Sequence, residues 1–179
     1  MDVNICNPLR PIDRQEPREI RKLLGQFATG VTIMTTSSEQ GRNVGMTANS
    51  FSSLSLDPPL ILWSISKTAP SYVDFTQCQY FAVHMLAQEH HQLSAHFARG
   101  AEDKFAGVGY HMVEQGIPVL QDTLATLVCR NVKQYEGGDH TILIGEIELY
   151  HQTPRDPLLF YAGGYHVPVQ HPAYCKEVS

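Results

Sequence analysis

Two short segments of the chain are rich in small polar residues and could bind a ligand. Residues 45–53 read GMTANSFSS, and residues 64–71 read SISKTAPS, in which Lys67 is the one charged residue. Hydroxyl, amide and backbone N–H groups that converge in an apolar pocket can satisfy a heterocycle rich in acceptors. A lysine among hydroxyls can also bind a phosphate group. Ordinary turns have the same composition, so the residues alone leave both interpretations open.

Other polar residues give weaker signals. The charged residues 102–104 precede Phe105, but most runs of this kind are exposed and carry no chemistry. His90, His91 and His96 lack the i, i+4 spacing of a helical zinc site, so they indicate a solvated helix face rather than a metal site. His140 follows a pair of glycines and could project over the mouth of a pocket, although a plain turn residue is the alternative.

The sequence gives no support for a nucleophile. It contains no Gly-x-Ser-x-Gly elbow. The four cysteines, at positions 6, 78, 129 and 175, form no Cys-x-x-Cys pair, which argues against a zinc knuckle, a thioredoxin-like motif and a disulfide scaffold. We therefore expect reduced thiols that are mostly packed, and no bound metal.

Length and charge exclude several classes of protein. The 179 residues, 42% hydrophobic and 17% charged, suffice for one globular domain and are not typical of disorder. A net charge of −5 offers no basic surface for nucleic acid. The longest apolar runs are far too short to span a membrane, and the N-terminal residues do not resemble a signal peptide. A cytoplasmic protein is expected.

The hydrophobic pattern predicts a mostly β domain with two or three helices. We expect an irregular arm over residues 1–17, the domain over residues 18–166 and a tail over residues 167–179. Ile20, Leu23, Leu24 and Phe27 have helical spacing and predict a helix over residues 18–28, with its apolar face on the domain and its end at Gly30. Short helices are expected over residues 71–75 and 88–98.

The remaining segments predict antiparallel strands. They are expected over residues 31–36, 44–48, 60–66, 80–86, 124–135, 141–151 and 158–161. The glycines of the loop at residues 136–140 suit the positive φ of a tight hairpin turn between the two longest strands. Strands and helices in these proportions favour a closed or split β-barrel with helical covers.

Five segments, in order along the chain, resemble the signatures of the flavin reductase family of split-barrel flavoenzymes. They are FATGVT (27–32), GMTANSFSSLSLDPP (45–59), DKF (103–105), GDHTILIG (138–145) and PLLFY (157–161). Each is weak alone, but five in family order over residues 27–165 are hard to obtain by chance. The resemblance implies an NAD(P)H:flavin oxidoreductase that reduces FMN or FAD, using NADH or NADPH, and supplies reduced flavin to a partner monooxygenase.

The resemblance also implies the site residues. Nicotinamide would contact His140 and Tyr165. The hydride would pass directly between the two ring systems, so the protein would position them and supply no catalytic acid or base. The flavin-binding residues implied are Thr47, Ala48, Asn49, Ser50, Ser53, Ser64, Ile65, Ser66, Lys67, Thr68, Ser71, Asp103, Lys104 and Phe105.

Two departures from the family pattern affect the flavin site. His84 stands where relatives usually have asparagine, and Lys67 stands where many carry arginine, so a bidentate phosphate contact would become a point charge. The choice between FMN and FAD therefore stays open.

Alternative functions on the same barrel also stay open. One is an FMN-binding electron carrier or sensor. Another is a haem-binding or pyridoxamine-phosphate-oxidising relative, which the Gly-Asp-His segment disfavours. A homodimer is expected, because a barrel of this size has only a shallow groove for two cofactors and a second subunit could supply the missing wall. Residues 158–165 are expected to contribute to the dimer interface.

Overall fold

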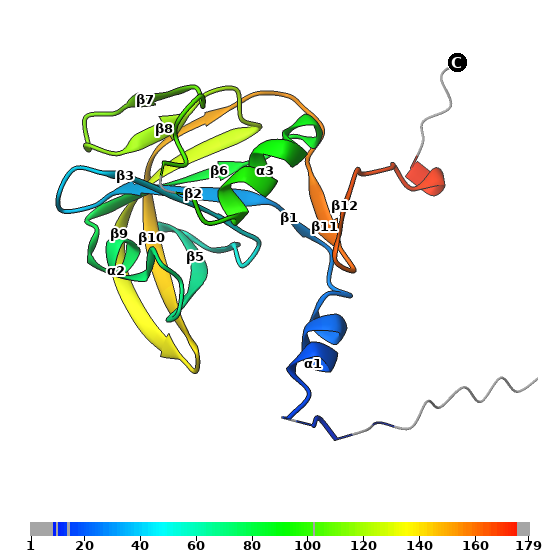
Figure 1. Cartoon of the computed structure of the whole chain (residues 1–179). Helices are drawn as coiled ribbons and strands as arrows, with labels where there is room; N and C mark the ends of the chain where they lie inside the picture. Colours follow the sequence, from blue (N-terminus) through cyan, green and yellow to red (C-terminus); the bar gives the residue numbers. More distant parts are fainter. Residues whose placement is uncertain (1–8, 10, 14, 102, 175–179) are drawn as a thin grey trace, which may run out of the picture.

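The computed structural model describes residues 9, 11–13, 15–101 and 103–174, and its main feature is one curved antiparallel sheet (Figure 1). The order of strands in this sheet is β3-β2-β6-β9-β10-β5-β4. Its edge strands, β3 and β4, are not paired with each other, so within the described part of the chain the barrel is split. The bounds are β2 (Thr32–Ser37), β3 (Asn43–Ala48), β4 (Ser52–Leu56), β5 (Pro59–Ser66), β6 (Tyr80–Met85), β9 (Ala125–Gly137) and β10 (His140–Gln152).

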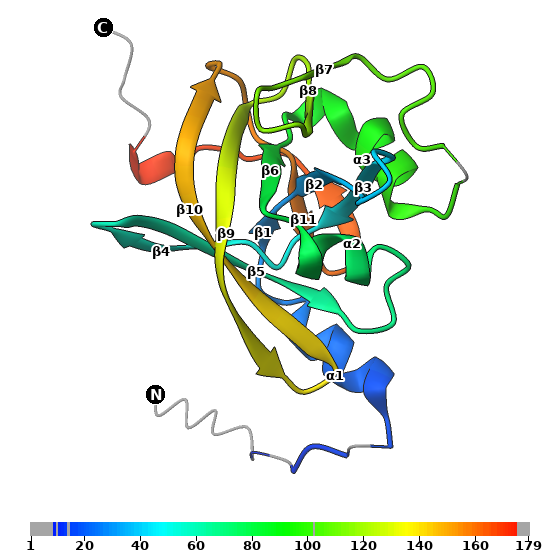
Figure 2. The ribbon, with the colours of Figure 1, turned by 90° about the vertical axis from the view of Figure 1, so that its left-hand side faces the viewer.

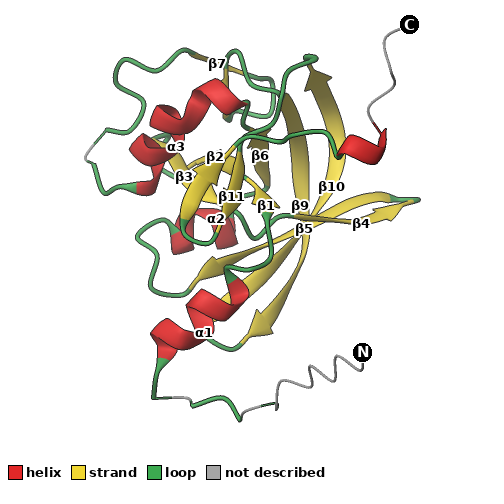
Figure 3. Cartoon of the chain, turned by 90° about the vertical axis from the view of Figure 1, so that its right-hand side faces the viewer, coloured by secondary structure: helices red, strands yellow, loops and turns green. Residues whose placement is uncertain are grey.

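Smaller elements complete the fold. Two short sheets have the orders β1-β11-β12 and β7-β8. Their strands are β1 (Thr29–Gly30), β11 (Leu159–Tyr161), β12 (Gly164–His166), β7 (Tyr110–Met112) and β8 (Pro118–Leu120). The helices are α1 (Pro17–Leu24), α2 (Tyr72–Gln77) and α3 (His91–Ala98), with single 3₁₀ turns at η1 (Gln88–His90) and η2 (Pro172–Tyr174). Figure 3 shows α2 and α3 on one side of the large sheet, with β4 projecting on the other.

The expected strands are confirmed, with shifts of one or two residues at their ends. The hairpin of β9 and β10 is the longest feature of the sheet and reaches well beyond the barrel (Figure 2). Its turn is tighter than expected, because only Gly138 and Asp139 lie between the strands. Gly138 has φ +73°, a conformation that glycine adopts without steric cost.

Several elements were not foreseen. Residues 52–56 were not among the expected strands, but they form the edge strand β4, whose side chains are mostly exposed and so lack a hydrophobic signal. The short strands β1, β7, β8 and β12 were also missed. The helix expected over residues 88–98 is confirmed only in part, since its first turn is the 3₁₀ turn η1.

The prediction for the first helix is wrong in two respects. Helix α1 ends at Leu24, capped by Gly25, whereas Gly30 belongs to strand β1. No residue of α1 is buried, and the helix lies below the barrel in Figure 1. Leu24 and Phe27 are 69% and 78% exposed. The apolar face is present in the sequence, but this chain offers it no surface to cover.

Two clusters of aromatic residues fill the core. Trp63, Phe75 and Phe81 are fully buried in the first, with the Trp63 and Phe75 rings edge to face at 5.0 Å. Phe97 and Phe105 form the second, with ring centroids 5.4 Å apart. The second cluster fixes helix α3 beside the start of strand β3.

At Gly45, strand β3 packs closely against helix α3. A Cβ atom at Gly45 would lie 2.5 Å from Cε1 of Phe97, which real Cβ atoms do not tolerate. Glycine therefore lets the buried Phe97 ring pack directly on the β3 backbone. This contact places the end of α3 opposite the polar segment that begins at Gly45.

Candidate functional site

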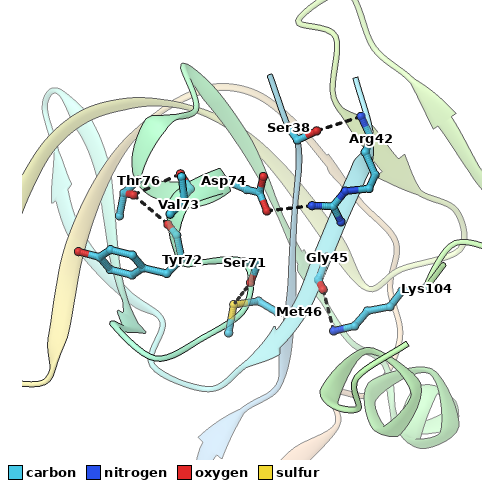
Figure 4. Close-up of polar contacts among 10 residues, drawn as sticks. All are labelled: Ser38, Arg42, Gly45, Met46, Ser71, Tyr72, Val73, Asp74, Thr76 and Lys104. Carbon is cyan, nitrogen blue, oxygen red and sulfur yellow. Dashed lines mark hydrogen bonds and ion pairs between the residues drawn. The ribbon is translucent and has the colours of Figure 1, made fainter. Parts of the chain in front are cut away.

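A groove lies between strand β3, the segment before helix α2, and the end of helix α3. Figure 4 shows its polar contacts. Its volume is about 290 Å³, and it brings together parts of the chain that are distant in sequence. The residues that line it are Arg42, Asn43, Val44, Gly45, Met46, Thr47, Ala69, Pro70, Ser71, Asp74, Phe97, Ala98, Arg99, Gly100, Ala101 and Lys104.

Lys104 is anchored at this groove by backbone carbonyls. Its Nζ donates to the carbonyl oxygen of Gly45 at 3.1 Å and to that of Phe97 at 2.8 Å. Burial lowers the pKa of Lys104. An ammonium group has three N–H donors, so these two contacts with described residues leave capacity for an acceptor in the groove.

Arg42 also lines the groove, although sequence analysis did not select it. Its Nη2 donates to Oδ2 of Asp74 at 3.3 Å, and its backbone N–H donates to Oγ of Ser38 at 3.1 Å. The ion pair joins β3 to α2 across one end of the groove (Figure 4). Arg99 is a further cation of the lining that sequence analysis did not select.

Ser71 forms the wall opposite Lys104, at the start of α2. Its hydroxyl donates to the sulfur of Met46 at 3.4 Å. Of the implied flavin-binding residues, Thr47, Ser71 and Lys104 line the groove. These three come from different elements, so only the folded chain brings them together.

Lys67 does not line this groove. Its ammonium pairs with the carboxylate of Glu136 on β9, and this hydrogen bond is the main cause of the raised pKa of Lys67. The backbone N–H of Lys67 donates to the carbonyl oxygen of Asp139 at 3.0 Å. The tip of the β9–β10 hairpin therefore binds the segment at residues 64–68 through both the side chain and the backbone of Lys67.

His140 lies at the same hairpin tip, opposite Ser66 in the register of β10 and β5. Its Nδ1 is 2.7 Å from Oδ1 of Asp139, and its side chain is 41% exposed. The hydrogen bond with His140 lowers the pKa of the Asp139 carboxyl. His140 and Asp139 thus form a hydrogen-bonded pair that is open to solvent.

Several of the implied hydroxyls bind protein backbone or each other. Thr47 Oγ1 donates to the carbonyl of Ser94 at 2.7 Å. Ser50 Oγ donates to the carbonyl of Ser64 at 2.8 Å and accepts from its N–H at 3.2 Å. Ser66 and Thr68 hydroxyls are 3.0 Å apart. These hydrogen bonds fix the conformation of the segments. A ligand would therefore contact the backbone of the segments and the remaining lone pairs of these hydroxyl oxygens.

Ile65 and Phe105 lie in the hydrophobic core. Ile65 is fully buried in the first cluster, and Phe105 is buried beneath Phe97 in the second. Asp103 caps the turn before Phe105, since its Oδ1 accepts from the Phe105 N–H at 2.8 Å. Ser53 is exposed on edge strand β4. These four residues therefore lie outside the lining of the groove.

A second, mostly apolar hollow is lined in part by the segment that begins at Gly45. Its volume is about 240 Å³, and Asn49 and Phe51 contribute to its wall together with Gly30, Val31, Thr32, Met85, Leu86, Leu124, Pro157 and Leu158. Thr47 faces the first groove and Asn49 faces this hollow. Residues 47–49 therefore contribute to the lining of both spaces.

Tyr165 is linked to the same region through helix α3. Its hydroxyl is 2.8 Å from the hydroxyl of Ser94, and Ser94 is fully buried. The carbonyl of Ser94 in turn accepts the hydrogen bond from Thr47. One residue of α3 thus contacts both an implied nicotinamide residue and an implied flavin residue.

The described histidines and cysteines give no sign of a metal site or a disulfide. His96 Nε2 is 2.8 Å from the carbonyl of Lys104. Cys78 and Cys129 are free thiols, and burial raises the pKa of Cys129 to about 12. Cys6 and Cys175 lie outside the described residues. Among the described residues, no three His, Cys, Asp or Glu side chains gather to hold a metal ion. In the same part of the chain, no helix is long and apolar enough to span a bilayer.

Comparisons with known proteins give one consistent result. The sequence model of the family described as "Flavin reductase like domain" matches residues 24–168. The chain is 39% identical over 151 residues to "FMN reductase (NADH) SmoA" of Agrobacterium fabrum, covering 84% of this chain and 86% of that protein. It is 39% identical over 153 residues to the reductase component of the flavin-dependent trigonelline monooxygenase of Acinetobacter baylyi, covering 86% of this chain but only 49% of that longer protein.

A solved structure agrees with these sequence relatives. The NADH:FAD oxidoreductase SgcE6 of Streptomyces globisporus, solved with NAD and FAD fragments, superposes with a TM-score of 0.85 at 34% identity. The superposition covers 92% of this chain and 99% of that chain.

Proposed function

This chain belongs to the flavin reductase family, and on that basis we propose that it is an oxidoreductase that uses NADH or NADPH to reduce FMN or FAD. The observation that carries the proposal is the position of residues 45–49. This segment, which bears a family signature, contributes to the lining of both a groove with cationic side chains and a mostly apolar hollow. A flavin needs both environments, because it combines a flat ring system with a phosphate-bearing chain.

The donors present fit the phosphate-bearing end of a flavin. Among the described residues that line the groove, Arg42, Arg99 and Lys104 are cationic and Asp74 is the one carboxylate, so these residues carry an excess of positive charge. Charge-assisted hydrogen bonds from such groups to phosphate are about twice as strong as neutral ones. We assign this end of the flavin to the groove beside Lys104 and Ser71.

The ring system is assigned to the segment of Thr47, Ala48, Asn49 and Ser50. Backbone N–H groups in this segment, with the amide of Asn49, would supply donors to the ring edge. The hydrogen bonds of Thr47 and Ser50 to neighbouring strands and helices hold the segment rigid. Donors that are fixed in advance stabilise developing charge without reorganisation.

The bound flavin would supply the hydride acceptor of the reaction. The task of this chain is to hold the donor ring against it and to exclude water. His140, oriented by Asp139, and Tyr165, oriented by Ser94, are proposed to position the nicotinamide. Neither needs to transfer a proton for a hydride to move.

The relatives also suggest the partners. The trigonelline relative is named as the reductase component of a monooxygenase, and we propose that reduced flavin from this chain likewise serves a separate oxygenase. A second copy of the chain is the further proposed partner. The exposed Leu23, Leu24 and Phe27 give each chain an apolar surface, and exposed Tyr161 and Tyr165 extend it, whereas Leu158 is already buried in its own core.

Anaerobic titration tests this proposal. Purified protein is mixed with NADH or NADPH and with riboflavin, FMN or FAD, and flavin bleaching and nicotinamide oxidation are followed. We expect catalytic reduction of at least one flavin by one donor. A flavin that is bound tightly but turned over hardly at all by either donor would favour an electron carrier or sensor instead.

A further inference from the structure

We propose that Arg42 is the residue that selects flavins carrying a phosphate group, and that Asp74 orients its guanidinium for this role. The inference rests on the proposed function and adds a specificity-determining residue to it. The ligand chemistry is a phosphate ester, which is the monophosphate of FMN or the diphosphate of FAD.

The first argument is the location of the Arg42 side chain. It lines the same groove as Lys104, although the two residues are far apart in sequence and lie on different elements. In Figure 4 the guanidinium extends from the start of β3 towards Asp74 on α2, and the Lys104 ammonium turns towards Gly45. Two cations therefore reach one groove from different directions.

The second argument is how firmly the guanidinium is oriented. Asp74 is largely buried, with 17% of its side chain exposed, and it accepts from Arg42 Nη2 at 3.3 Å. The Arg42 backbone is itself held by the Ser38 hydroxyl. An arginine has five N–H donors in a rigid plane, so a single carboxylate contact leaves donors for a ligand. The Arg42 side chain is 59% exposed and is open to such a ligand.

The third argument is the charge balance of the groove. Among the described residues that line it, Asp74 pairs with one of three cations, which leaves these residues a surplus of positive charge. A phosphate monoester has nearly two negative charges at neutral pH, and arginine can bind two of its oxygens at once. Riboflavin has no such group and would gain nothing from Arg42.

The fourth argument is that Lys67, the cation of the polar segment at residues 64–71, is already engaged. Lys67 is paired with Glu136 of the hairpin and is outside the lining of the groove. A phosphate at Lys67 would compete with that carboxylate.

The test compares the dissociation constants of riboflavin, FMN and FAD for the full chain and four variants, measured by fluorescence titration without NADH. We expect Arg42→Ala to weaken FMN or FAD about tenfold or more relative to riboflavin. Arg42→Lys, which keeps the charge but loses the planar fork, should recover only part of this loss. Lys67→Ala and the matched control Arg18→Ala, an exposed arginine on α1, should leave the ratio within about twofold.

Each outcome bears on the proposal. A loss for both phosphorylated flavins supports a contact with the phosphate shared by FMN and FAD, and a loss for FAD alone supports a contact with the second phosphate. An unchanged ratio in folded Arg42→Ala, or a larger effect of Lys67→Ala, overturns the proposal. If Arg42→Ala does not fold, Arg42→Gln is used in its place. Failure of the proposed function is separate, because it would appear as absence of NADH or NADPH oxidation by the unaltered chain with every flavin.

Discussion

The hydroxyl of Tyr165 on strand β12 lies 2.8 Å from the buried hydroxyl of Ser94 on helix α3. This bond ties the small sheet β1-β11-β12 to the helix that packs on the candidate site. The Ser94 carbonyl also accepts from Thr47, so a single helical residue connects two segments that are assigned to different ligands.

We expect Tyr165→Phe and Ser94→Ala to destabilise the protein by about 1 kcal/mol each, since each removes one hydrogen bond. Because both remove the same bond, the double variant should cost little more than either single one. Urea unfolding of the three variants measures this coupling. Both single variants should also raise the apparent KM for the nicotinamide donor while flavin affinity is unchanged. Fully additive losses would show that the two hydroxyls do not interact.

His140→Ala tests the proposed nicotinamide position. We expect the apparent KM for NADH to rise roughly tenfold, which corresponds to about 1.4 kcal/mol. Any change in kcat should be a decrease of similar size, and the Kd of FMN should change little. The reason is that the imidazole orders the donor ring and does not contact the flavin phosphate. Stopped-flow reduction of bound flavin at several NADH concentrations provides the measurement. Unchanged NADH affinity together with an unchanged limiting rate would remove His140 from the site.

His84 predicts a pH dependence of stability. It is fully buried between two backbone groups, as its Nδ1 is 3.0 Å from the Ile33 carbonyl and its Nε2 accepts from the Leu120 N–H at 3.0 Å. Burial lowers its pKa from 6.5 to about 4. In the unfolded chain the His84 imidazole therefore becomes protonated as the pH falls below 6.5, whereas in the folded chain it stays neutral down to about pH 4.

The resulting stability is complete above the unfolded pKa and is lost as pH falls from 6.5 towards 4, by up to about 3 kcal/mol. Urea unfolding at a series of pH values measures it. His84→Gln serves as the reference, since it removes the titrating group while other histidines remain. An equal loss of stability in this variant over the same range would assign the effect to those other groups.

Gly45→Ala tests the close packing of β3 against α3. We expect a loss of about 1–3 kcal/mol, because the added methyl would overlap the buried ring of Phe97. Thermal or urea unfolding gives the value. Gly30→Ala is the matched control, since a Cβ there meets no atom within 4 Å. Equal effects of the two substitutions would mean that the Phe97 contact does not restrict position 45.

The exposed face of α1 predicts self-association. At micromolar concentration we expect a light-scattering mass twice the 20.0 kDa of one chain. Replacing Leu24 and Phe27 by aspartate should shift the protein towards the monomer, since burying the charges of two carboxylates is costly. Arg18→Asp, which helical spacing places on the opposite face of α1, should not. A single-chain mass for the unaltered protein with flavin present would contradict the prediction.

The sequence by itself determined most strands of the large sheet, the long hairpin and the location of the main polar segment. β-Branched and aromatic runs between turn residues are local signals, so such a strand can be recognised from its own residues. The glycine at the turn of β9 and β10 is likewise required by its own backbone conformation. Edge strand β4 has few buried residues and therefore gives no such signal.

Only the tertiary structure decided which charged groups face the groove. Lys67 is the cation within the polar segment, yet strand pairing brings Glu136 to it from β9. Arg42 carried no signal in the sequence, yet the packing of β3 against α2 sets it beside Asp74 at the groove. Such pairings depend on the register of strands and on contacts between distant elements, and no local pattern in the sequence encodes them. The apolar face of α1 can be read from the sequence of the helix, but the surface against which it packs cannot.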